Sequence, residues 1–153
     1  VPQPVPYYAA SFSARGEEMN ARILTSHQSV RNAMLAIRAK GKEASAKENA
    51  QLSTLQIVNE MMARGIEFLP IDFYKSDAKK FLVEDGKIRL PFASVEGIGE
   101  NAAILIANAA KKGGYLSKDD LQIDGGIPKG VIDTLNELHV LDFLPDTLQM
   151  SLF

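Results

Sequence analysis

Residues 91–110 read P-F-A-S-V-E-G-I-G-E-N-A-A-I-L-I-A-N-A-A, and the centre of this stretch is Gly97-Ile98-Gly99. A short apolar segment leads into a turn with two glycines, and an alanine-rich run with high helix propensity follows. Glycine adopts positive φ and carries no Cβ, so backbone N–H groups in such a turn can approach a ligand closely. Ile98, between the two glycines, is expected to point inward and attach the turn to the core. The stretch therefore predicts a helix-hairpin-helix pattern.

The predicted hairpin has the properties of a phosphate site. The helix that begins at Glu100 and Asn101 starts with free N–H groups and the positive end of its dipole, which together suit a phosphate oxygen. A turn of this kind contacts the backbone of nucleic acid without reading its base sequence. The alternative is that Gly97 and Gly99 only close a tight connection between two packed helices. The motif by itself leaves both interpretations open.

Two antiparallel helices joined by a short charged loop are predicted upstream of the hairpin. In residues 22–40 four apolar positions fall on one helical face, and Gly41 ends that helix. Ser45 to Glu48 forms a capping box for the second helix, and Gly65 lies at its C-terminal cap. The expected buried positions are Ile23, Val30, Met34 and Ile37 in the first helix and Leu52, Leu55, Val58 and Met62 in the second.

A small β-hairpin is predicted between these helices and the two-glycine turn. Residues 80–83 and 87–90 flank Glu84-Asp85-Gly86, in which Asp-Gly favours a tight positive-φ turn. Residues 66–73 alternate and contain aromatic side chains, which is typical of an extended segment. At the N-terminus, residues 1–6 hold three prolines and are expected to be extended, and residues 7–12 to be the end of a helix.

Three helices are predicted after the two-glycine turn. The first covers residues 100–112 and stops at Gly113-Gly114. Ser117 caps a short helix that ends near Gln122, and Pro128 starts another helix that runs to Leu138. Together the elements predict a mainly α fold with a small β-hairpin.

Composition excludes several classes of function. No apolar run approaches the roughly 20 residues that span a bilayer, so no membrane partner is expected. The chain has no cysteine, and His27 and His139 are far apart, so neither a disulfide nor a metal site is expected, and no cofactor is assigned. A reducing, cytoplasmic setting is the natural default.

The net charge of −2 argues against a chain that binds DNA strongly by itself, because neutralising phosphates normally requires an excess of Lys and Arg. The charge is unevenly distributed. Residues 1–50 carry seven Lys or Arg against four Asp or Glu, whereas residues 101–153 carry four against seven. Binding by the hairpin is therefore expected to depend on backbone amides and a few lysines.

The chain ends with an apolar pentapeptide, Gln149-Met150-Ser151-Leu152-Phe153. Met, Leu and Phe beside a hydrogen-bonding Gln are typical of a docking peptide that fills a preformed apolar pocket. The alternative is a terminal segment that folds back onto its own core.

Five stretches, in this order, resemble the C-terminal part of the bacterial C-family replicative DNA polymerases of the PolC type: Tyr7 to Phe12, Glu60 to Asp72, Val95 to Asn101, Leu141 to Pro145, and Gln149 to Phe153. The resemblance implies three parts. Residues 1–79 would be a helical, fingers-derived segment, and residues 80–145 a β-hairpin plus a tandem helix-hairpin-helix domain that binds duplex DNA. Residues 146–153 would be a flexible tail that docks on the sliding β-clamp. The implied partners are primer-template DNA, the β-clamp and the remainder of the polymerase chain.

The resemblance also suggests which residues contact DNA. Many such turns have a basic or hydroxyl residue where Glu100 stands, which moves the expected contacts to backbone amides or to nearby side chains. A second, degenerate motif would span Pro128 to Leu144, with His139 where the family commonly has glycine. In the clamp motif, Met150 replaces the commoner Leu. The residues assigned to the DNA backbone are Gly97, Ile98, Gly99, Glu100, Asn101, Lys111 and Lys112.

In that family the catalytic palm, with its metal-binding aspartates, lies N-terminal of the matching stretch. No catalytic or metal-binding residue is therefore assigned here, and Mg²⁺ is expected in the palm of a parent DNA-directed DNA polymerase, of which this chain is expected to be a fragment. Asp119 and Asp120 are interpreted as residues of a helix start, and Asp72 as the polar end of an extended segment. This chain is not expected to polymerise DNA alone.

Two other functions remain as alternatives. In the first alternative, the chain is a free-standing helix-hairpin-helix protein that recognises DNA structure. In the second, it is an interaction module whose hairpins pack against protein and whose tail is the main binding site. Salt dependence separates them, because binding to phosphates weakens steeply with added salt and docking of an apolar tail does not.

Overall fold

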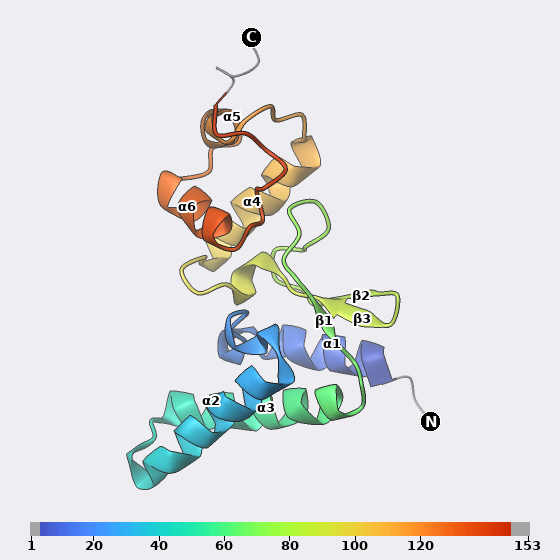
Figure 1. Ribbon diagram of the computed structural model, residues 1–153, viewed down its shortest axis with the longest axis vertical. Helices are drawn as coiled ribbons and strands as arrows, with labels where there is room; N and C mark the ends of the chain where they lie inside the picture. Colours follow the sequence, from blue (N-terminus) through green and yellow to red (C-terminus); the bar gives the residue numbers. More distant parts are fainter. Residues whose placement is uncertain (1–3, 148–153) are drawn as a thin grey trace.

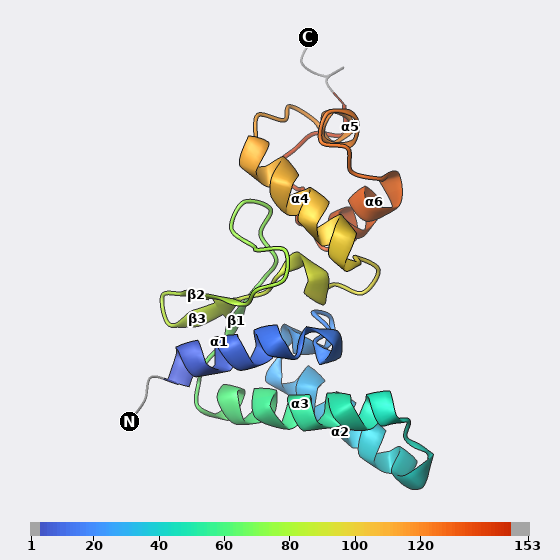
Figure 2. The ribbon, with the colours of Figure 1, turned by 180° about the vertical axis from the view of Figure 1, so that it is seen from behind.

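The computed structural model describes residues 4–147, which form a mainly helical chain around one small sheet (Figure 1). Helices α1 to α3 gather at one end of the molecule, α4 to α6 lie at the other, and the sheet lies between them, as the view from behind confirms (Figure 2). The helices are α1 (Pro4–Ala14), α2 (His27–Lys40), α3 (Ala46–Ala63), α4 (Glu100–Lys112), α5 (Lys118–Ile123) and α6 (Lys129–Glu137). The strands are β1 (Phe68–Leu69), β2 (Leu82–Glu84) and β3 (Lys87–Arg89), and short 3₁₀ turns are η1 (Gly16–Glu18), η2 (Ile23–Thr25), η3 (Gly41–Glu43) and η4 (Phe92–Ser94).

The N-terminal prolines begin a helix, contrary to the expectation that residues 1–6 are extended. Pro4 and Pro6 lie in the first turn of α1, where a missing N–H costs nothing because that group has no helical partner. The ring of Phe12, fully buried in α1, lies 5.6 Å from that of Phe68 and 5.8 Å from that of Phe81, measured between centroids. These aromatic contacts attach α1 to the sheet.

Helices α2 and α3 form the predicted antiparallel pair. The capping box at Ser45 and Glu48 is present, and Gly41 ends α2 with φ of 54°. Helix α2 begins at His27 rather than near Arg22, because the side chain of Ser26 accepts the N–H of Ser29 and makes Ser26 the N-cap. The buried positions are Val30, Met34 and Ile37 of α2 and Thr54, Leu55, Val58 and Met61 of α3. Three positions predicted to be buried, Ile23, Leu52 and Met62, are only partly buried and pack against the core from its edge.

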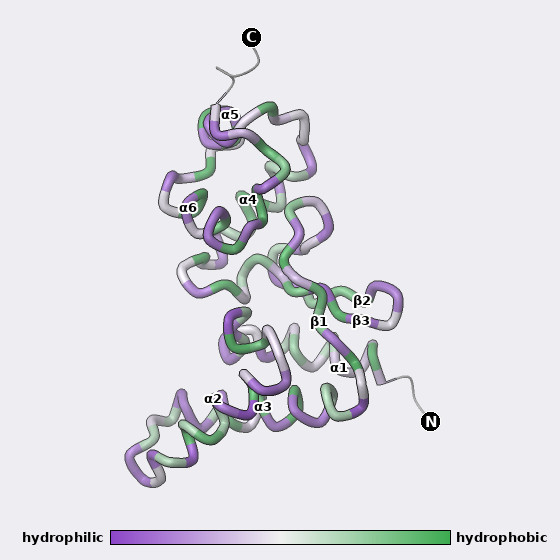
Figure 3. The backbone as a smooth tube through the Cα atoms, viewed as in Figure 1, coloured by the Kyte–Doolittle hydropathy of each residue, from purple (hydrophilic) through white to green (hydrophobic). Residues whose placement is uncertain are grey.

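The predicted β-hairpin is confirmed and belongs to a three-stranded sheet in the order β1-β3-β2. Asp85 and Gly86 both have positive φ at its turn, which appears as a hydrophilic tip in Figure 3. The sequence did not indicate that β1 pairs with β3 in parallel, with Phe68 opposite Ile88. Of the segment 66–73, only Phe68 and Leu69 form a strand.

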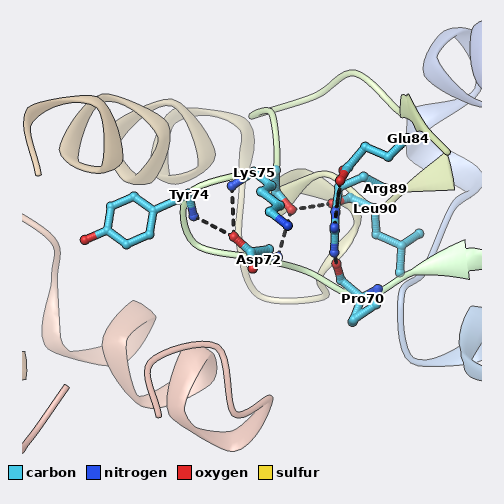
Figure 4. Close-up of polar contacts among 8 residues, drawn as sticks. Pro70, Asp72, Tyr74, Lys75, Glu84, Arg89 and Leu90 are labelled. Carbon is cyan, nitrogen blue, oxygen red and sulfur yellow. Dashed lines mark hydrogen bonds and ion pairs between the residues drawn. The ribbon is translucent and has the colours of Figure 1, made fainter. Parts of the chain in front are cut away.

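Asp72 lies at the polar end of the extended segment, as expected, and its side chain also caps the turn that follows. Its Oδ1 accepts the backbone N–H groups of Tyr74 and Lys75, both at 2.9 Å (Figure 4). The same arrangement recurs five residues later, where Oδ2 of Asp77 accepts the N–H groups of Lys79 and Lys80. A carboxylate that bonds the backbone in this way stabilises a turn over a strand, which explains why the extended segment stops.

A partly buried ion pair connects this turn to the hairpin. The guanidinium of Arg89, 7% exposed, donates to both carboxylate oxygens of Glu84 at 2.6 and 2.8 Å and to the carbonyl of Pro70 at 2.9 Å (Figure 4). Hydrogen bonding from Arg89 holds the pKa of Glu84 below its usual range. The pair therefore positions β2 and β3 relative to the segment that follows β1.

Four aromatic rings attach the loop after β1 to the segments that follow α4 and α6. Phe73 lies 6.4 Å from Tyr115 and 5.7 Å from Phe143, centroid to centroid, and Tyr74 packs at 5.5 Å from Phe143. Tyr115 is buried, its hydroxyl has no hydrogen-bond partner among residues 4–147, and burial raises its pKa.

We expect Tyr115→Phe to stabilise the fold by about 0.5–1 kcal/mol, because the change removes a buried polar group that makes no hydrogen bond. Thermal unfolding followed by circular dichroism should show a Tm increase of about 1–4 °C. Tyr74→Phe is the matched control, since the side chain of Tyr74 is 55% exposed and its hydroxyl can bond to water. A decrease in Tm for Tyr115→Phe alone would contradict the expectation.

Candidate nucleic-acid interface

The first hairpin has the geometry that its sequence predicts, with one difference. Gly97 has φ of 93°, Ile98 is buried with 3% exposure, and the N–H of Ile98 donates to the carbonyl of Val95 at 3.0 Å. Gly99 is the N-cap of α4, with φ of −71°, so only Gly97 uses the left-handed conformation. The lack of a side chain at Gly99, rather than its φ, is what leaves the helix start accessible.

The N-terminus of α4 carries no side-chain cap. The first N–H groups of a helix have no carbonyl partner within the helix, so those of Glu100 and Asn101 are available to an external acceptor. A Cβ added at Gly99 would meet no atom within 4 Å, which leaves open space in front of these groups. Asn101 is exposed beside them.

Glu100 is partly neutralised by a lysine that sequence reasoning did not assign to the site. Nζ of Lys79 lies 2.6 Å from Oε1 of Glu100, and both side chains are more than half exposed. The two residues line a hollow of about 500 Å³ beside the hairpin, together with Glu17 and Glu18. The surface next to the first hairpin therefore has mixed charge, and its anion-binding groups are the backbone amides.

A second hairpin repeats this geometry between α5 and α6. Gly126 has φ of 66°, Ile127 is buried with 1% exposure, and Pro128 is the N-cap of α6 without a side-chain cap. These three residues correspond to Gly97, Ile98 and Gly99, and α6 begins with an exposed lysine, Lys129, where α4 begins with a glutamate. The two helix starts are the repeated feature of this domain.

The position predicted for the second motif, Pro128 to Leu144, is therefore corrected. The hairpin consists of Gly126, Ile127 and Pro128, so it ends where the predicted motif begins, and α6 follows it. His139 does take the left-handed conformation, with φ of 62°, but it follows the end of α6, and Nδ1 lies 3.1 Å from Oδ2 of Asp142. Because no helix follows within residues 138–147, this turn is a helix C-terminus rather than a hairpin between helices.

Lys111 and Lys112 are separated from the first hairpin. They lie in the last turn of α4, at the end away from Gly99 (Figure 2). With a rise of 1.5 Å per residue, the helix places them about 18 Å from its start. Both are exposed, and neither forms an ion pair with the rest of the described chain. Of the seven assigned residues, the structure brings together Gly97 to Asn101 and places these two lysines elsewhere.

Two further predictions concern other sites. Asp119 and Asp120 lie in the first turn of α5, whose N-cap is Ser117, which confirms their interpretation as residues of a helix start. The residues assigned to clamp binding, Gln149 to Phe153, lie outside the described residues.

Within residues 4–147, no three acidic, His or Cys side chains cluster in a way that could hold a metal ion. Among the described helices, none is both long enough and apolar enough to span a membrane.

Two hairpins, each with a left-handed glycine, a buried isoleucine and an uncapped helix start, define a tandem helix-hairpin-helix domain. Residues 65–148 match the family of the helix-hairpin-helix motif, and the chain belongs to this family.

The relatives of the chain indicate a narrower family than the motif does. PolC-type DNA polymerase III of Lacticaseibacillus paracasei is 41% identical over 152 residues, which is 98% of this chain and 10% of the relative. The enzyme of the same name from Bacillus subtilis is 38% identical over 148 residues, 96% of this chain and 10% of the relative. That of Listeria innocua is 36% identical over the whole chain and 11% of the relative. The resemblance to the PolC type is confirmed, and the chain spans about a tenth of the length of these relatives.

Proposed function

We propose that this chain is the part of a PolC-type replicative DNA polymerase that binds the backbone of the primer-template duplex. The observation that carries the proposal is the repeated hairpin, in which Gly97 and Gly126 each precede a buried isoleucine and an uncapped helix start. Two helix N-termini of this kind offer backbone N–H groups and positive dipole ends to phosphate oxygens without contacting bases.

Binding in this form depends on few cations. Lys129 supplies a positive charge at the second hairpin, and Lys79 reduces the negative charge at the first. Because the chain has a net charge of −2, its affinity for DNA is expected to be modest and most of the affinity of a polymerase to come from its other parts. Residues 1–79 are proposed as the fingers-derived segment and residues 80–145 as the duplex-binding domain.

Nucleotide addition is proposed to occur elsewhere in the polymerase, on a palm that holds Mg²⁺. No residue of this chain is assigned to catalysis, and the chain is proposed to act in the cytoplasm with the remainder of the polymerase. The named activity of the relatives supports the assignment to DNA replication.

Titrating the chain against a labelled 20-base-pair duplex tests the proposal. Fluorescence anisotropy at about 50 mM salt should give a dissociation constant in the range of non-specific binders, about 10⁻⁴ to 10⁻⁶ M, that weakens steeply as salt increases. Replacing the duplex sequence should leave the constant unchanged, since the hairpins contact the backbone. Sequence-dependent binding, or no binding at all, would contradict the proposal.

We also propose that Gln149 to Phe153 docks on the sliding β-clamp. Support comes from the composition of this segment and its resemblance to the clamp-docking motif. A labelled peptide of residues 144–153 is expected to bind purified clamp with micromolar or tighter affinity, and alanine at positions 149, 152 and 153 to abolish binding. In the whole chain, Leu152→Ala with Phe153→Ala should leave the Tm unchanged. A large loss of Tm would show instead that the tail belongs to the core.

A further inference from the structure

Helix α2 carries basic residues and no acidic ones. Residues 27–40 contain Arg31, Arg38 and Lys40 and no aspartate or glutamate, and Lys42 follows in η3. The chain as a whole has a net charge of −2, so this excess of cations is local. The excess also lies far from the second hairpin, because α2 and α3 project as an arm at the opposite end of the molecule from α5 and α6 (Figure 1).

The basic residues of α2 are exposed and lie on a different face from its buried residues. Val30, Met34 and Ile37 form the buried face of α2, whereas Arg31, Leu35 and Arg38, spaced by four and three residues, share the exposed face. Figure 3 shows hydrophilic residues recurring along this helix. We call Arg31, Arg38 and Lys42 the basic arm residues.

These three cations have no acidic partner. Lys40, in contrast, forms an ion pair with Glu48 of α3. Among the described residues, Arg31, Arg38 and Lys42 take part in no ion pair or side-chain hydrogen bond. Their charges are therefore not neutralised by a direct ion pair, and they attract a polyanion.

We infer that the basic arm residues bind the phosphodiester backbone of nucleic acid. Arg31 and Arg38 are about 10 Å apart along the helix axis, at 1.5 Å per residue. Phosphates of one DNA strand are spaced about 3.4 Å along the duplex axis, so the two arginines match phosphates about three nucleotides apart. The guanidinium group forms two parallel hydrogen bonds with phosphate, which favours arginine at such positions.

The exposed face favours nucleic acid over a protein partner. Leu35, 61% exposed, is its only large apolar side chain, whereas an interface between proteins normally has a larger apolar centre. Gln28 and Asn32 add neutral polar groups, which bond to each other at 2.9 Å. The inference uses no residue of the hairpins and therefore does not depend on the proposed function.

The test is a salt titration of the whole chain carrying Arg31→Gln, Arg38→Gln and Lys42→Gln. Fluorescein-labelled probes are a 20-base-pair duplex and a 20-nucleotide oligo(dT), because either form of DNA supplies the phosphodiester backbone. Each phosphate contact contributes about 0.9 to the slope of log K against log salt on duplex and about 0.7 on a single strand. The slope is negative, and on one or both probes its magnitude should therefore fall by about 2–3. The probe that responds identifies the form of DNA that is bound.

Two control variants separate a local contact from a general effect of charge. Arg64→Gln with Lys75→Gln and Lys87→Gln removes the same number of exposed cations elsewhere and should change the slope by less than about 0.5. Arg31→Lys with Arg38→Lys and Lys42→Arg keeps the charge and should keep the slope. The circular dichroism melting curve of each variant shows that it is folded. If the slope is unchanged on both probes, or if the control variant lowers it equally, the inference is wrong.

A hairpin variant in the same titration keeps the two ideas distinguishable. Gly99→Asp with Pro128→Asp places a carboxylate at both helix starts. Loss of slope in the arm variant alone would support this inference and contradict the proposed function of the hairpins. Loss of binding in the hairpin variant alone would overturn this inference and support the proposed function, and loss in both would support both.

Discussion

Gly99→Asp should leave the chain folded and reduce its affinity for duplex DNA by at least tenfold. Aspartate is among the best N-cap residues, and a negative charge at a helix N-terminus is favourable, so the Tm is expected to stay equal or to rise. Gly99 has an ordinary φ of −71°, and an added Cβ meets no neighbouring atom, so the backbone is not strained. The new carboxylate would accept the N–H groups offered to phosphate and would repel the DNA.

Pro128→Asp is the matched change at the second hairpin, because Pro128 occupies the same N-cap position of α6. Gly97→Val serves as a contrast, since a β-branched residue at φ of 93° strains the turn and should lower the Tm as well as the affinity. Anisotropy and thermal unfolding are measured on the same samples. Full affinity in a folded Gly99→Asp chain would mean that the glycines only close a connection between helices.

Glu84→Ala should destabilise the fold by about 3 kcal/mol, because it leaves the buried guanidinium of Arg89 without its carboxylate. For a domain of this size the Tm should fall by about 6–12 °C. Glu67→Ala is the control on the same sheet, since the pair of Glu67 with Lys87 is long, at 3.6 Å, and exposed, and its loss should cost less than 1 kcal/mol.

The same carboxylate makes stability depend on pH. The pKa of Glu84 is lower in the folded chain than in the unfolded chain, so its stabilising contribution is complete above the unfolded pKa of about 4.3 and is lost as pH falls through the folded pKa. Glu84→Gln cannot ionise, and its stability should decrease less between pH 5 and pH 3 than that of the unchanged chain. Parallel acid-unfolding curves for the two proteins would contradict this assignment.

Local signals in the sequence were sufficient for most elements. The capping box at Ser45, the Asp85-Gly86 turn and the helix over residues 100–112 are all present, because each depends on residues close together in the chain. The parallel pairing of β1 with β3 could not be predicted in this way. It depends on where the chain returns after residue 70, and a two-residue strand leaves no periodic pattern to detect.

The sequence predicted the first hairpin of the candidate site and missed the second. The first hairpin has two glycines, whereas the second has Gly126-Ile127-Pro128, where proline replaces glycine at the N-cap. Aligning G-I-G with G-I-P would have located it, because both triplets place an isoleucine in the core between a left-handed residue and a helix start. His139 was misleading because a left-handed residue ends a helix as readily as it forms a hairpin. The lysine partner of Glu100 lies 21 residues away and could be found only in three dimensions.

The parallel pairing of β1 with β3 has a consequence for dividing this chain experimentally. A truncated chain that begins at residue 80, at the boundary between the proposed fingers-derived and duplex-binding parts, lacks β1 and turns β3 into an open sheet edge. This truncated chain also lacks Pro70, whose carbonyl accepts a hydrogen bond from Arg89, and Phe73, whose ring packs against that of Phe143. Truncation at residue 80 should therefore yield an aggregation-prone product, whereas truncation near residue 65, before β1, keeps the sheet complete.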